Sequence, residues 1–463
     1  MIHASVQYPW LDVSSPIRSG RFTYGTLELD EGTGVMRCHY SLDDIELVET
    51  VDVGPGHEWT PAAYEAARIV ALLAGVSYYK AGAPSVIDLG DMGVREGERE
   101  FIRDFYIQGL GEFAYRNGLD LTDLRIVGGV PLTREASPAS GHRQADPSRL
   151  LVPFGGGVDS IVTVECLREA RYDMELFVVN RRGVPRFEAI ERAAAVTGLD
   201  VRRAQREIDP WILSPPEGAS PFNGHVPVTG IVSAIAVLCA VLDGASAVVM
   251  SNEWSASKPT LVADGVAVNH QYSKSDAFES SLRAVLKSAL GDEPDFFSLL
   301  RASSELWVAR RFAQTPSYHA AFRSCNRAFH LDPALRLDTW CGRCDKCCFI
   351  DLILAPFMDR DALADIFGAA EPLEQTDLVE RFEALIGTGK NFKPFECVGD
   401  VDECRVAVKL ASVRADRAGN KILAALTEQL ETCGGAGPSD PATFFRPIGS
   451  HNIPDDLAAS SLV

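Results

Sequence analysis

Apolar and polar residues alternate through residues 21–53, and a polar turn with two glycines interrupts the alternation at 30–34. Alternation with a period of two places every second side chain on one face of a strand, and such a turn reverses the chain. The pattern predicts an antiparallel hairpin sheet. Its apolar positions include Phe22, Tyr24, Leu27, Leu29, Met36, Cys38 and Tyr40.

Helical spacing follows this sheet. Thr60 precedes an apolar face that includes Ala67, Val70, Leu73 and Ala74. A threonine hydroxyl satisfies the free N–H groups at a helix start, so a helix capped by Thr60 is expected. A second helix is expected over residues 98–117.

From residue 149 onward, short apolar runs alternate with helical patterns. Strands are predicted at 150–153, 175–179, 199–202 and 246–250, and helices at 160–171, 187–197 and 229–242. Apolar strands separated by helices favour a parallel sheet that is covered on both faces. The predicted fold class is therefore α/β, with a doubly wound, mostly parallel sheet.

The same patterns divide the chain into five parts. Residues 134–148 are rich in Pro, Ser and Ala and lack periodicity, which is typical of a linker. The expected parts are an N-terminal α+β domain at 1–133, this linker, the sheet domain at 149–360, a helical region at 361–433 and a weakly structured tail at 434–463.

The sequence LLVPFGGGVDS at 150–160 predicts a strand, a glycine turn and a helix start. Glycines let the backbone approach a ligand, and the helix start directs free N–H groups at an anion. Asp159 is suited to a phosphate-shielding metal, and Ser160 to a phosphate oxygen. The loop resembles SGGxDS, the pyrophosphatase loop of enzymes that split ATP into AMP and pyrophosphate on an adenine nucleotide alpha hydrolase-like sheet. Gly155 replaces the first Ser, and an ordinary glycine-rich turn is the alternative.

Ligands bind at the carboxyl ends of the strands in such sheets. This edge gathers Gly155, Gly156, Gly157, Asp159, Ser160 and Asn180 as candidate nucleotide-binding residues, with polar segments at 223–230, 251–257 and 268–275.

Four residues of these segments are candidate proton carriers. Glu253 directly follows a predicted strand, where it is placed to share Mg²⁺ with Asp159 or to act as a base. His270 and Lys274 share a face if their segment is helical. His225 is the fourth candidate. For each one, a capping or surface role is the alternative.

Cys341, Cys344 and Cys347 form a C-x2-C-x2-C motif, and Cys325 precedes it. Four thiolates in this arrangement suit tetrahedral zinc, with Arg343 and Lys346 offsetting the negative charge. Cys348 or His330 could replace Cys325, and an iron–sulfur cluster is the alternative. The other cysteines are expected to be core or incidental thiols: Cys38, Cys166, Cys239, Cys397, Cys404 and Cys433.

Composition narrows the function classes. The net charge of −20 argues against a nucleic-acid-binding surface, which needs clustered Lys and Arg. The first 15 residues lack a basic segment followed by an apolar stretch, and the longest apolar run, 231–242, is too short to span a bilayer. A cytoplasmic protein with reduced thiols and no membrane partner is expected.

Five motifs occur in a specific order: GGGVDS at 155–160, SNEWSAS at 251–257, VNHQYSKS at 268–275, WCGRCDKC at 340–347 and KPFECVG at 393–399. Together they resemble the MurL family of UDP-N-acetylmuramoyl-L-alanyl-L-glutamate epimerases, from AGVSYYK at 74–80 to about residue 399. The resemblance implies that ATP and Mg²⁺ are used to invert the terminal L-Glu of UDP-MurNAc-L-Ala-L-Glu, releasing AMP and pyrophosphate. It also implies an upstream ligase that adds L-Glu to the muramoyl-L-alanine precursor.

Two other function classes stay open. The glycine loop and the cysteine motif alone also fit 7-cyano-7-deazaguanine synthases or another ATP-dependent carboxylate-activating enzyme, such as an amide ligase. A non-enzymatic module that binds a nucleotide and zinc is the remaining alternative.

Overall fold

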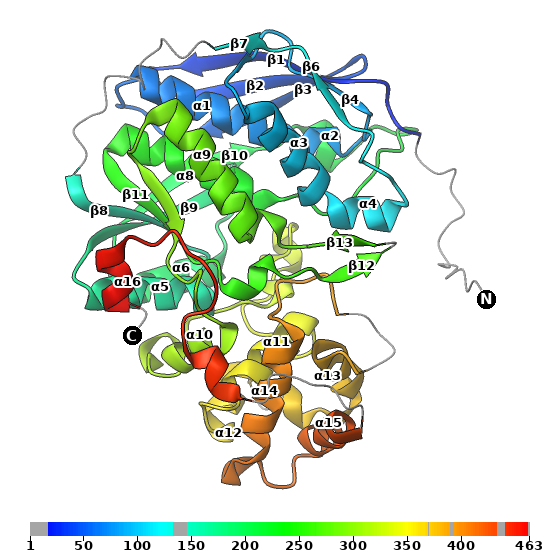
Figure 1. Ribbon diagram of the computed structural model, residues 1–463, viewed down its shortest axis with the longest axis vertical. Helices are drawn as coiled ribbons and strands as arrows, with labels where there is room; N and C mark the ends of the chain where they lie inside the picture. The colour runs from blue at the N-terminus through cyan, green and yellow to red at the C-terminus, as the bar shows by residue number, and fades with distance from the viewer. Residues whose placement is uncertain are drawn as a thin grey trace.

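The computed structural model describes residues 17–132, 146–263, 265–368, 370–388, 393–432 and 440–461. One ten-stranded sheet runs through it in the order β14-β11-β8-β9-β10-β3-β2-β1-β4-β6 (Figure 1). Its strands are β1 (Phe22–Asp30), β2 (Val35–Leu42), β3 (Ile45–Asp52), β4 (Val86–Asp88), β6 (Arg125–Val127), β8 (Asp146–Pro153), β9 (Asp173–Arg181), β10 (Val201–Glu207), β11 (Ala245–Met250) and β14 (Asp295–Ser298).

Two small sheets and sixteen α-helices complete the described part of the chain. The small sheets pair β5 (Gly93–Val94) with β7 (Val130–Pro131), and β12 (Leu261–Ala263) with β13 (Val266–Val268). The helices are α1 (Pro61–Ala74), α2 (Val76–Tyr79), α3 (Glu98–Gly109), α4 (Gly111–Asn117), α5 (Val158–Glu169), α6 (Glu188–Thr197), α7 (Pro210–Leu213), α8 (Val228–Asp243), α9 (Asp276–Leu290), α10 (Glu305–Phe312), α11 (Asp345–Leu354), α12 (Arg360–Phe367), α13 (Val379–Ile386), α14 (Val401–Ser412), α15 (Lys421–Thr432) and α16 (Asp455–Ser461).

The strands from β14 to β10 are parallel, as the alternation of apolar runs and helical patterns predicts. Their two faces belong to different apolar clusters. One cluster joins them to α5, α6 and α10, and the other to α1, α8 and α9. Apolar strands need cover on both faces, so the predicted α/β architecture is confirmed.

The N-terminal strands β1, β2 and β3 form the expected antiparallel sheet. They do not stand apart, because β3 pairs antiparallel with β10, where Val51 lies opposite Arg206. Their inner face and α1 pack in the same cluster as α8 and α9. The segments on either side of the expected linker therefore share one sheet and one core. Residues 134–145 of that linker lie outside the described residues, and β8 already begins at Asp146.

The structure also tests the expected cap at Thr60, the expected helix at 98–117 and the expected tail. Thr60 caps α1 by accepting a hydrogen bond from the Ala63 N–H. The helix expected over 98–117 is two helices, α3 and α4, because the chain turns at Leu110 between Gly109 and Gly111. In the tail, residues 440–461 differ from the expected weak structure: they include α16 and bury Phe444, Ile453 and Leu457.

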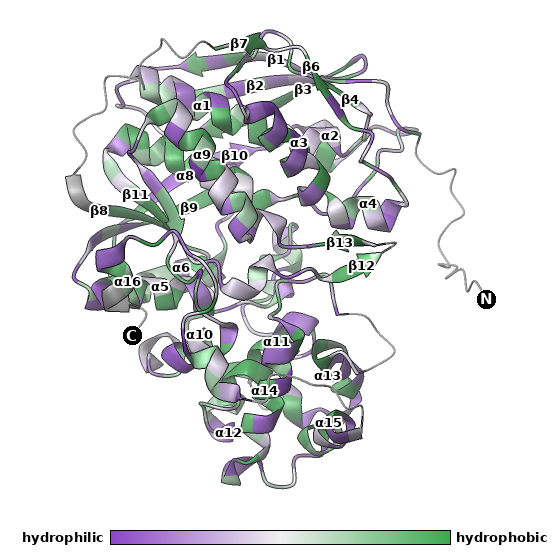
Figure 2. Ribbon diagram, viewed as in Figure 1, coloured by the Kyte–Doolittle hydropathy of each residue, from purple (hydrophilic) through white to green (hydrophobic). Residues whose placement is uncertain are grey.

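Figure 2 shows the β12–β13 hairpin as an apolar protrusion beside α4. Val262 and Val266 at its tip are 65% and 56% exposed. The longest apolar run lies in α8, which has 16 residues and is largely buried within the molecule. Across the described ranges, no helix is both long and apolar enough to cross a membrane.

Candidate active site

The glycine loop joins β8 to α5 at the carboxyl edge of the parallel strands. Gly156 has a φ of +73°, and a Cβ there would lie 3.0 Å from the Ala189 carbonyl oxygen, so this position requires glycine. No side chain among the described residues caps the start of α5. Its first N–H groups have no partner within the helix and are available to an anion.

A cavity of about 270 Å³ opens in front of this loop. Gly155, Asp159 and Ser160 line it on the loop side, and Ser251, Asn252 and Lys274 line it across the sheet edge. A Cβ at Gly155 would have no atom of the described residues within 4 Å, so a serine would fit at this position. No neighbouring side chain in that part of the chain occupies the space that the missing serine would take. The Ser160 hydroxyl donates to the Gly157 carbonyl at 3.1 Å and remains on the cavity wall.

A smaller pocket of about 20 Å³ adjoins this cavity and shares Asp159 and Lys274 with it. Its walls come from separate elements of the chain and are rich in charged groups. Its ionisable lining residues are Asp159, Glu253, Lys274, Glu305, Lys346 and Cys397. We call this group the proton pocket.

Arg301 fixes two members of the proton pocket through their backbone. Its guanidinium donates to the Glu253 carbonyl at 2.9 Å and to the Lys274 carbonyl at 2.7 Å. A buried ion pair with Glu279, also at 2.9 Å, holds the guanidinium in place. The two segments that carry Glu253 and Lys274 are therefore tied to one buried side chain.

Two carboxyl groups in the proton pocket, those of Glu253 and Glu305, resist ionisation. Burial raises the pKa of Glu253 well above its ordinary value, and the neighbouring Glu305 and Asp159 carboxylates add to the rise. Burial also raises the pKa of Glu305 to about 8, although Lys346 opposes the change. Like charges crowded in a low-dielectric site cannot all ionise, so protonated carboxyls are present near neutral pH.

Cys397 was expected to be an incidental thiol, but the structure places it among charged partners. Lys274 Nζ lies 3.4 Å from Cys397 Sγ, and His270 also hydrogen-bonds the thiol. Lys346 Nζ donates to the Cys397 carbonyl. Burial alone would raise the pKa of this thiol, but Lys274, His270 and Lys346 outweigh burial and lower it to about 6.

Behind Cys397 lies a carboxylate–imidazole pair. Glu112 accepts a hydrogen bond from His270 Nδ1 through one oxygen and one from Arg116 at 2.6 Å through the other. The ring of His225 lies against that of His270, with centroids 4.2 Å apart. Although the ligand atoms of Glu112, His225 and His270 fall within 4.8 Å of one another, both carboxylate oxygens are already engaged.

The two histidines have opposite pKa shifts. Burial lowers the pKa of His225 to about 4, and the charge of His270 adds to that effect. For His270, burial acts downward, but hydrogen bonds to Cys397 and Glu112 raise its pKa to about 9. His270 and Lys274 do not share an α-helix, since only Tyr272–Lys274 is helical, as a 3-10 turn. They nevertheless meet at Cys397.

Asn180 lies outside the cavity that faces the glycine loop. It lines a neighbouring cavity of about 270 Å³ with Arg181 and Arg203, farther along the same sheet edge. Its side-chain oxygen accepts a hydrogen bond from Arg203 at 3.4 Å. Of the six nucleotide-binding candidates, Asn180 is the one that lies on β9, the strand next to β8, and not in the segment that follows β8.

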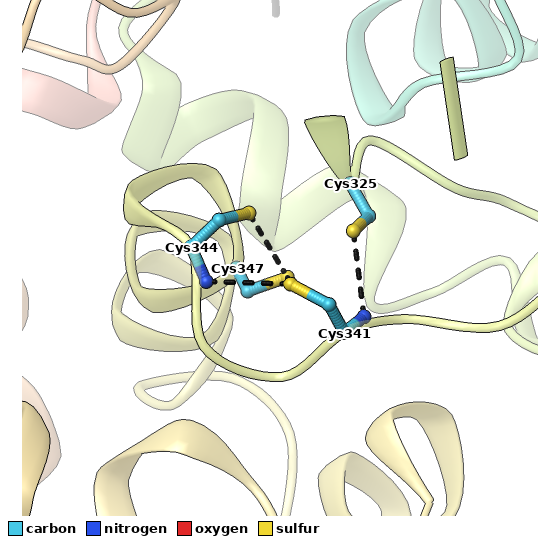
Figure 3. A group of neighbouring side chains, drawn as sticks. All are labelled: Cys325, Cys341, Cys344 and Cys347. Atoms are coloured by element: carbon cyan, nitrogen blue, oxygen red, sulfur yellow. Dashed lines mark hydrogen bonds between the residues drawn. The ribbon is translucent and has the colours of Figure 1, made fainter. Parts of the chain in front are cut away.

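The four cysteines of the motif converge, as Figure 3 shows. Their sulfur atoms lie within 4.8 Å of one another, with Sγ–Sγ distances of 3.7 Å from Cys341 to Cys347 and 3.4 Å from Cys344 to Cys347. Zn–S bonds of about 2.3 Å in a tetrahedron separate sulfurs by about 3.8 Å. The geometry thus fits zinc, and it brings Cys325, rather than Cys348 or His330, to the fourth corner.

The two basic residues of this motif have other partners. Arg343 pairs with Asp377 and donates to Gln375 at 2.9 Å. Lys346 reaches the proton pocket instead of the thiolates. The cysteine motif therefore places the Lys346 ammonium group in the proton pocket, from the first turn of α11.

Comparison with known proteins gives matches along almost the whole chain. Residues 14–299 match the MurL N-terminal domain and residues 321–438 the MurL C-terminal domain. The chain belongs to the MurL family. Proteins named UDP-N-acetyl-alpha-D-muramoyl-L-alanyl-L-glutamate epimerase are 38% identical to it in Xanthomonas oryzae pv. oryzae and in Micromonospora sp.. The first alignment covers 85% of this chain and 86% of the relative, and the second covers 95% and 97%. The Salinispora tropica relative, with the same name, is also 38% identical, and its alignment covers 85% of both chains.

The pattern of the sequence missed several residues of this MurL site. Glu112 and Glu305 carry no local signal, because each lies in a segment whose neighbours predict only helix or loop. Cys397 and Lys346 lie inside two of the five ordered motifs, and that membership is the signal that could have singled them out.

Proposed function

We propose that this protein uses ATP to invert the terminal L-Glu of UDP-MurNAc-L-Ala-L-Glu to D-Glu in peptidoglycan precursor synthesis. One observation carries the proposal: a glycine loop with free helix N–H groups adjoins a pocket of acids and bases, in a chain of the MurL family. A phosphate-binding element and proton-transfer groups are the two parts that this reaction needs.

The first step activates the α-carboxylate. A carboxylate oxygen attacks the α-phosphorus of ATP, pyrophosphate leaves, and an acyl-adenylate forms. The N–H groups of 155–158 and the start of α5 stabilise the departing pyrophosphate. Asp159 and Glu253, which share the proton pocket, supply the oxygen ligands that Mg²⁺ prefers. The metal, when bound, offsets the phosphate charge.

The second step inverts the α-carbon. Deprotonation beside a free carboxylate would place two negative charges side by side, and adenylation removes one of them. A base then takes the α-proton, and the electron pair moves to the acyl oxygen. A proton returns from the opposite face, and water cleaves the acyl-adenylate to AMP and the D-Glu product. The proton pocket holds groups of both kinds needed, a thiolate and neutral carboxyls.

The cysteine cluster has a structural part in this proposal. Four thiolates without an open ligand position form a closed zinc site, and such sites stabilise folds. Zinc held by Cys325, Cys341, Cys344 and Cys347 fixes the start of α11. The substrate requires an upstream ligase that adds L-Glu to the muramoyl-L-alanine precursor.

The test uses the purified full chain with ATP, Mg²⁺ and UDP-MurNAc-L-Ala-L-Glu. AMP and pyrophosphate are expected only when the dipeptide substrate is present, together with D-Glu in the hydrolysed product. ADP and phosphate as products would contradict adenylation. AMP formation with another carboxylic acid and none with this substrate would favour a different carboxylate-activating enzyme.

A further inference from the structure

Cys397 differs from the other described cysteines that lie outside the zinc-type cluster. Cys38, Cys166, Cys239, Cys348 and Cys404 are buried in the core, whereas Cys397 is partly exposed and lines the proton pocket. We propose that the Cys397 thiolate removes the α-proton of the terminal glutamate, and that His270, oriented by Glu112, passes that proton toward solvent. This role rests on the proposed epimerisation and identifies the base within it.

Position supports this role first. The proton pocket shares Asp159 and Lys274 with the cavity in front of the glycine loop. A carboxyl group joined to the α-phosphate at that loop therefore has its α-carbon beside the shared wall. Cys397 lines the proton pocket, and its Sγ lies 3.4 Å from Nζ of Lys274, a residue that both cavities share. A catalytic base must come within hydrogen-bond reach of the proton it takes, and Cys397 is the thiol that lines the pocket adjoining the cavity.

Charge supports it next. Three cations surround Cys397: Lys274 and His270 at the thiol, and Lys346 at its carbonyl. Cys166 and Cys239 each have a single cationic neighbour, Arg311 and Arg202, and burial still raises their pKa to about 11 and about 12. The pKa of Cys397 moves the other way, to about 6, so its thiolate is available at neutral pH.

The third support is a group of neighbouring proton-carrying side chains. Cys397 hydrogen-bonds His270, and His270 donates to Glu112. Next to this pair lies His225, whose side chain is 24% exposed and whose Nδ1 lies 4.0 Å from Glu112 Oε2. In catalytic triads a carboxylate orients an imidazole, and the imidazole acts on a nucleophile. Glu112, His270 and Cys397 have the same order here, but the sulfur takes a proton and does not attack carbon.

The step balances as follows. The thiolate takes the α-proton and becomes a thiol, while the C–H electron pair moves to the acyl oxygen. The neutral carboxyl of Glu305, in the same pocket, returns a proton from the other face. His270 is already protonated on both ring nitrogens, so it takes the thiol proton as it gives its Nδ1 proton to Glu112, which passes that proton toward solvent. The carboxylate that acted as the acid regains a proton from water, so no net charge accumulates.

The experiment separates adenylation from proton transfer in the full chain. Cys397→Ser and Cys397→Ala are compared with Cys239→Ala, a buried thiol in α8 that lies outside the pocket. Adenylation is read as substrate-dependent exchange of labelled pyrophosphate into ATP. Proton transfer is read as deuterium uptake at the glutamate α-carbon in heavy water. Melting curves establish that each variant is folded.

Both Cys397 variants are expected to keep pyrophosphate exchange within about threefold and to lose deuterium uptake by about a hundredfold or more. Cys239→Ala is expected to keep both activities. Deuterium uptake at the wild-type rate in a Cys397 variant overturns the proposal. So does parallel loss of both activities in folded variants, since the thiol would then serve adenylation. Absence of substrate-dependent exchange in the wild-type protein instead overturns the proposed function.

Two further measurements apply if both Cys397 variants fail to fold. In the wild-type chain, iodoacetamide is expected to modify Cys397 faster than Cys239 and to abolish deuterium uptake while exchange persists. Glu112→Gln, at a positioning residue, is expected to lower uptake about tenfold with exchange unchanged, because the His270 orientation is lost. Glu112→Asp restores uptake. Unchanged deuterium uptake in Glu112→Gln would contradict the relay of protons through His270. Full deuterium uptake after modification of Cys397 would contradict its role as the base.

Discussion

The cysteine cluster and the proton pocket lie next to each other but are built in opposite ways. The cluster takes three of its four ligands from a single turn, Cys341 to Cys347. The proton pocket takes its ionisable residues from six segments between Asp159 and Cys397, and the Glu112–His270 pair adds one more. Lys346 belongs to both regions, since it lies between two cysteines and reaches the pocket.

This difference teaches which chemistry a sequence reveals. A metal knuckle depends on local spacing, because one short turn sets most of the distances. An acid–base pocket depends on long-range packing, and its members have ordinary neighbours in the sequence. If the comparison is right, damage to the cluster affects folding, and damage to the pocket affects chemistry in a folded protein.

The largest effect is expected from Cys341→Ser. Loss of one thiolate should release zinc, and zinc-binding energy in such sites is folding energy of about 10 kcal/mol in model peptides. We expect the purified variant to carry no zinc and to be insoluble or to melt far below the wild type. Elemental analysis and calorimetry measure both.

Cys348→Ala is the matched control for that variant, because Cys348 is the adjacent cysteine and lies outside the four-sulfur group. It should keep one zinc per chain. Iron and sulfide in the wild-type protein, or zinc loss in Cys348→Ala alone, would refute the assigned ligand set.

Asp159→Asn is expected to lower AMP formation by about a hundredfold or more while the melting temperature stays close to wild type. Asp159 lines both cavities, and loss of an electrostatic contact to the transition state has this magnitude. Asp173→Asn, at the exposed start of β9, should leave AMP formation unchanged. Near-normal turnover in Asp159→Asn would mean that the glycine loop is not the phosphate site.

Lys346→Met tests the residue that joins the two regions. It should retain zinc and lower epimerisation by about tenfold, because one nearby charge shifts a pKa by about one unit or more. Arg343→Met, whose side chain pairs with Asp377 and Gln375, should retain both zinc and activity. Zinc loss in Lys346→Met would show that the lysine serves the thiolates after all.

The smallest effect is a pH dependence at His225. Its folded-state pKa of about 4 lies below the ordinary 6.5, so the folded protein loses stability as pH falls from 6.5 toward 4. His225→Gln escapes this loss. The melting temperature of the variant minus that of the wild type should therefore rise over that window. His270, with its pKa raised to about 9, stays protonated in the folded state throughout this window, and it is present in both proteins, so the comparison of variant with wild type reports on His225.

His451→Gln, at an exposed histidine, serves as the control for the pH series. If its melting temperature changes with pH in the same way as that of His225→Gln, the effect does not come from the histidine pair.

Much of the fold could be predicted from the sequence. Periodicity predicted β1 to β3, the parallel strands β8 to β11 and the helices α5, α6 and α8, because side-chain alternation and helical spacing are local, whereas β14 was not predicted. The pairing of β3 with β10 could not be predicted, since it joins Val51 to Arg206 across a large sequence separation. The split at Leu110 was missed because flanking glycines decide it, and the helical pattern continues through them.

The site residues also divide into those that local motifs identify and those that only the fold brings together. The glycine loop, Glu253, Lys274, His270 and the four cysteines were identified from motifs, and the structure brings all but the cysteines to one sheet edge. Cys397 was misread as incidental because an isolated thiol in a sequence is most often core packing. Its lowered pKa depends on Lys274 and His270, which only the fold places beside the thiol.

The chain order of these parts has a consequence for protein synthesis. The glycine loop is made early, and Cys397, the last residue of the proton pocket in the sequence, is made near the end. A chain leaving the ribosome, or one cut short before residue 397, carries the loop without the pocket. We expect such partial products to be unable to invert the glutamate, because the proposed base is absent from them.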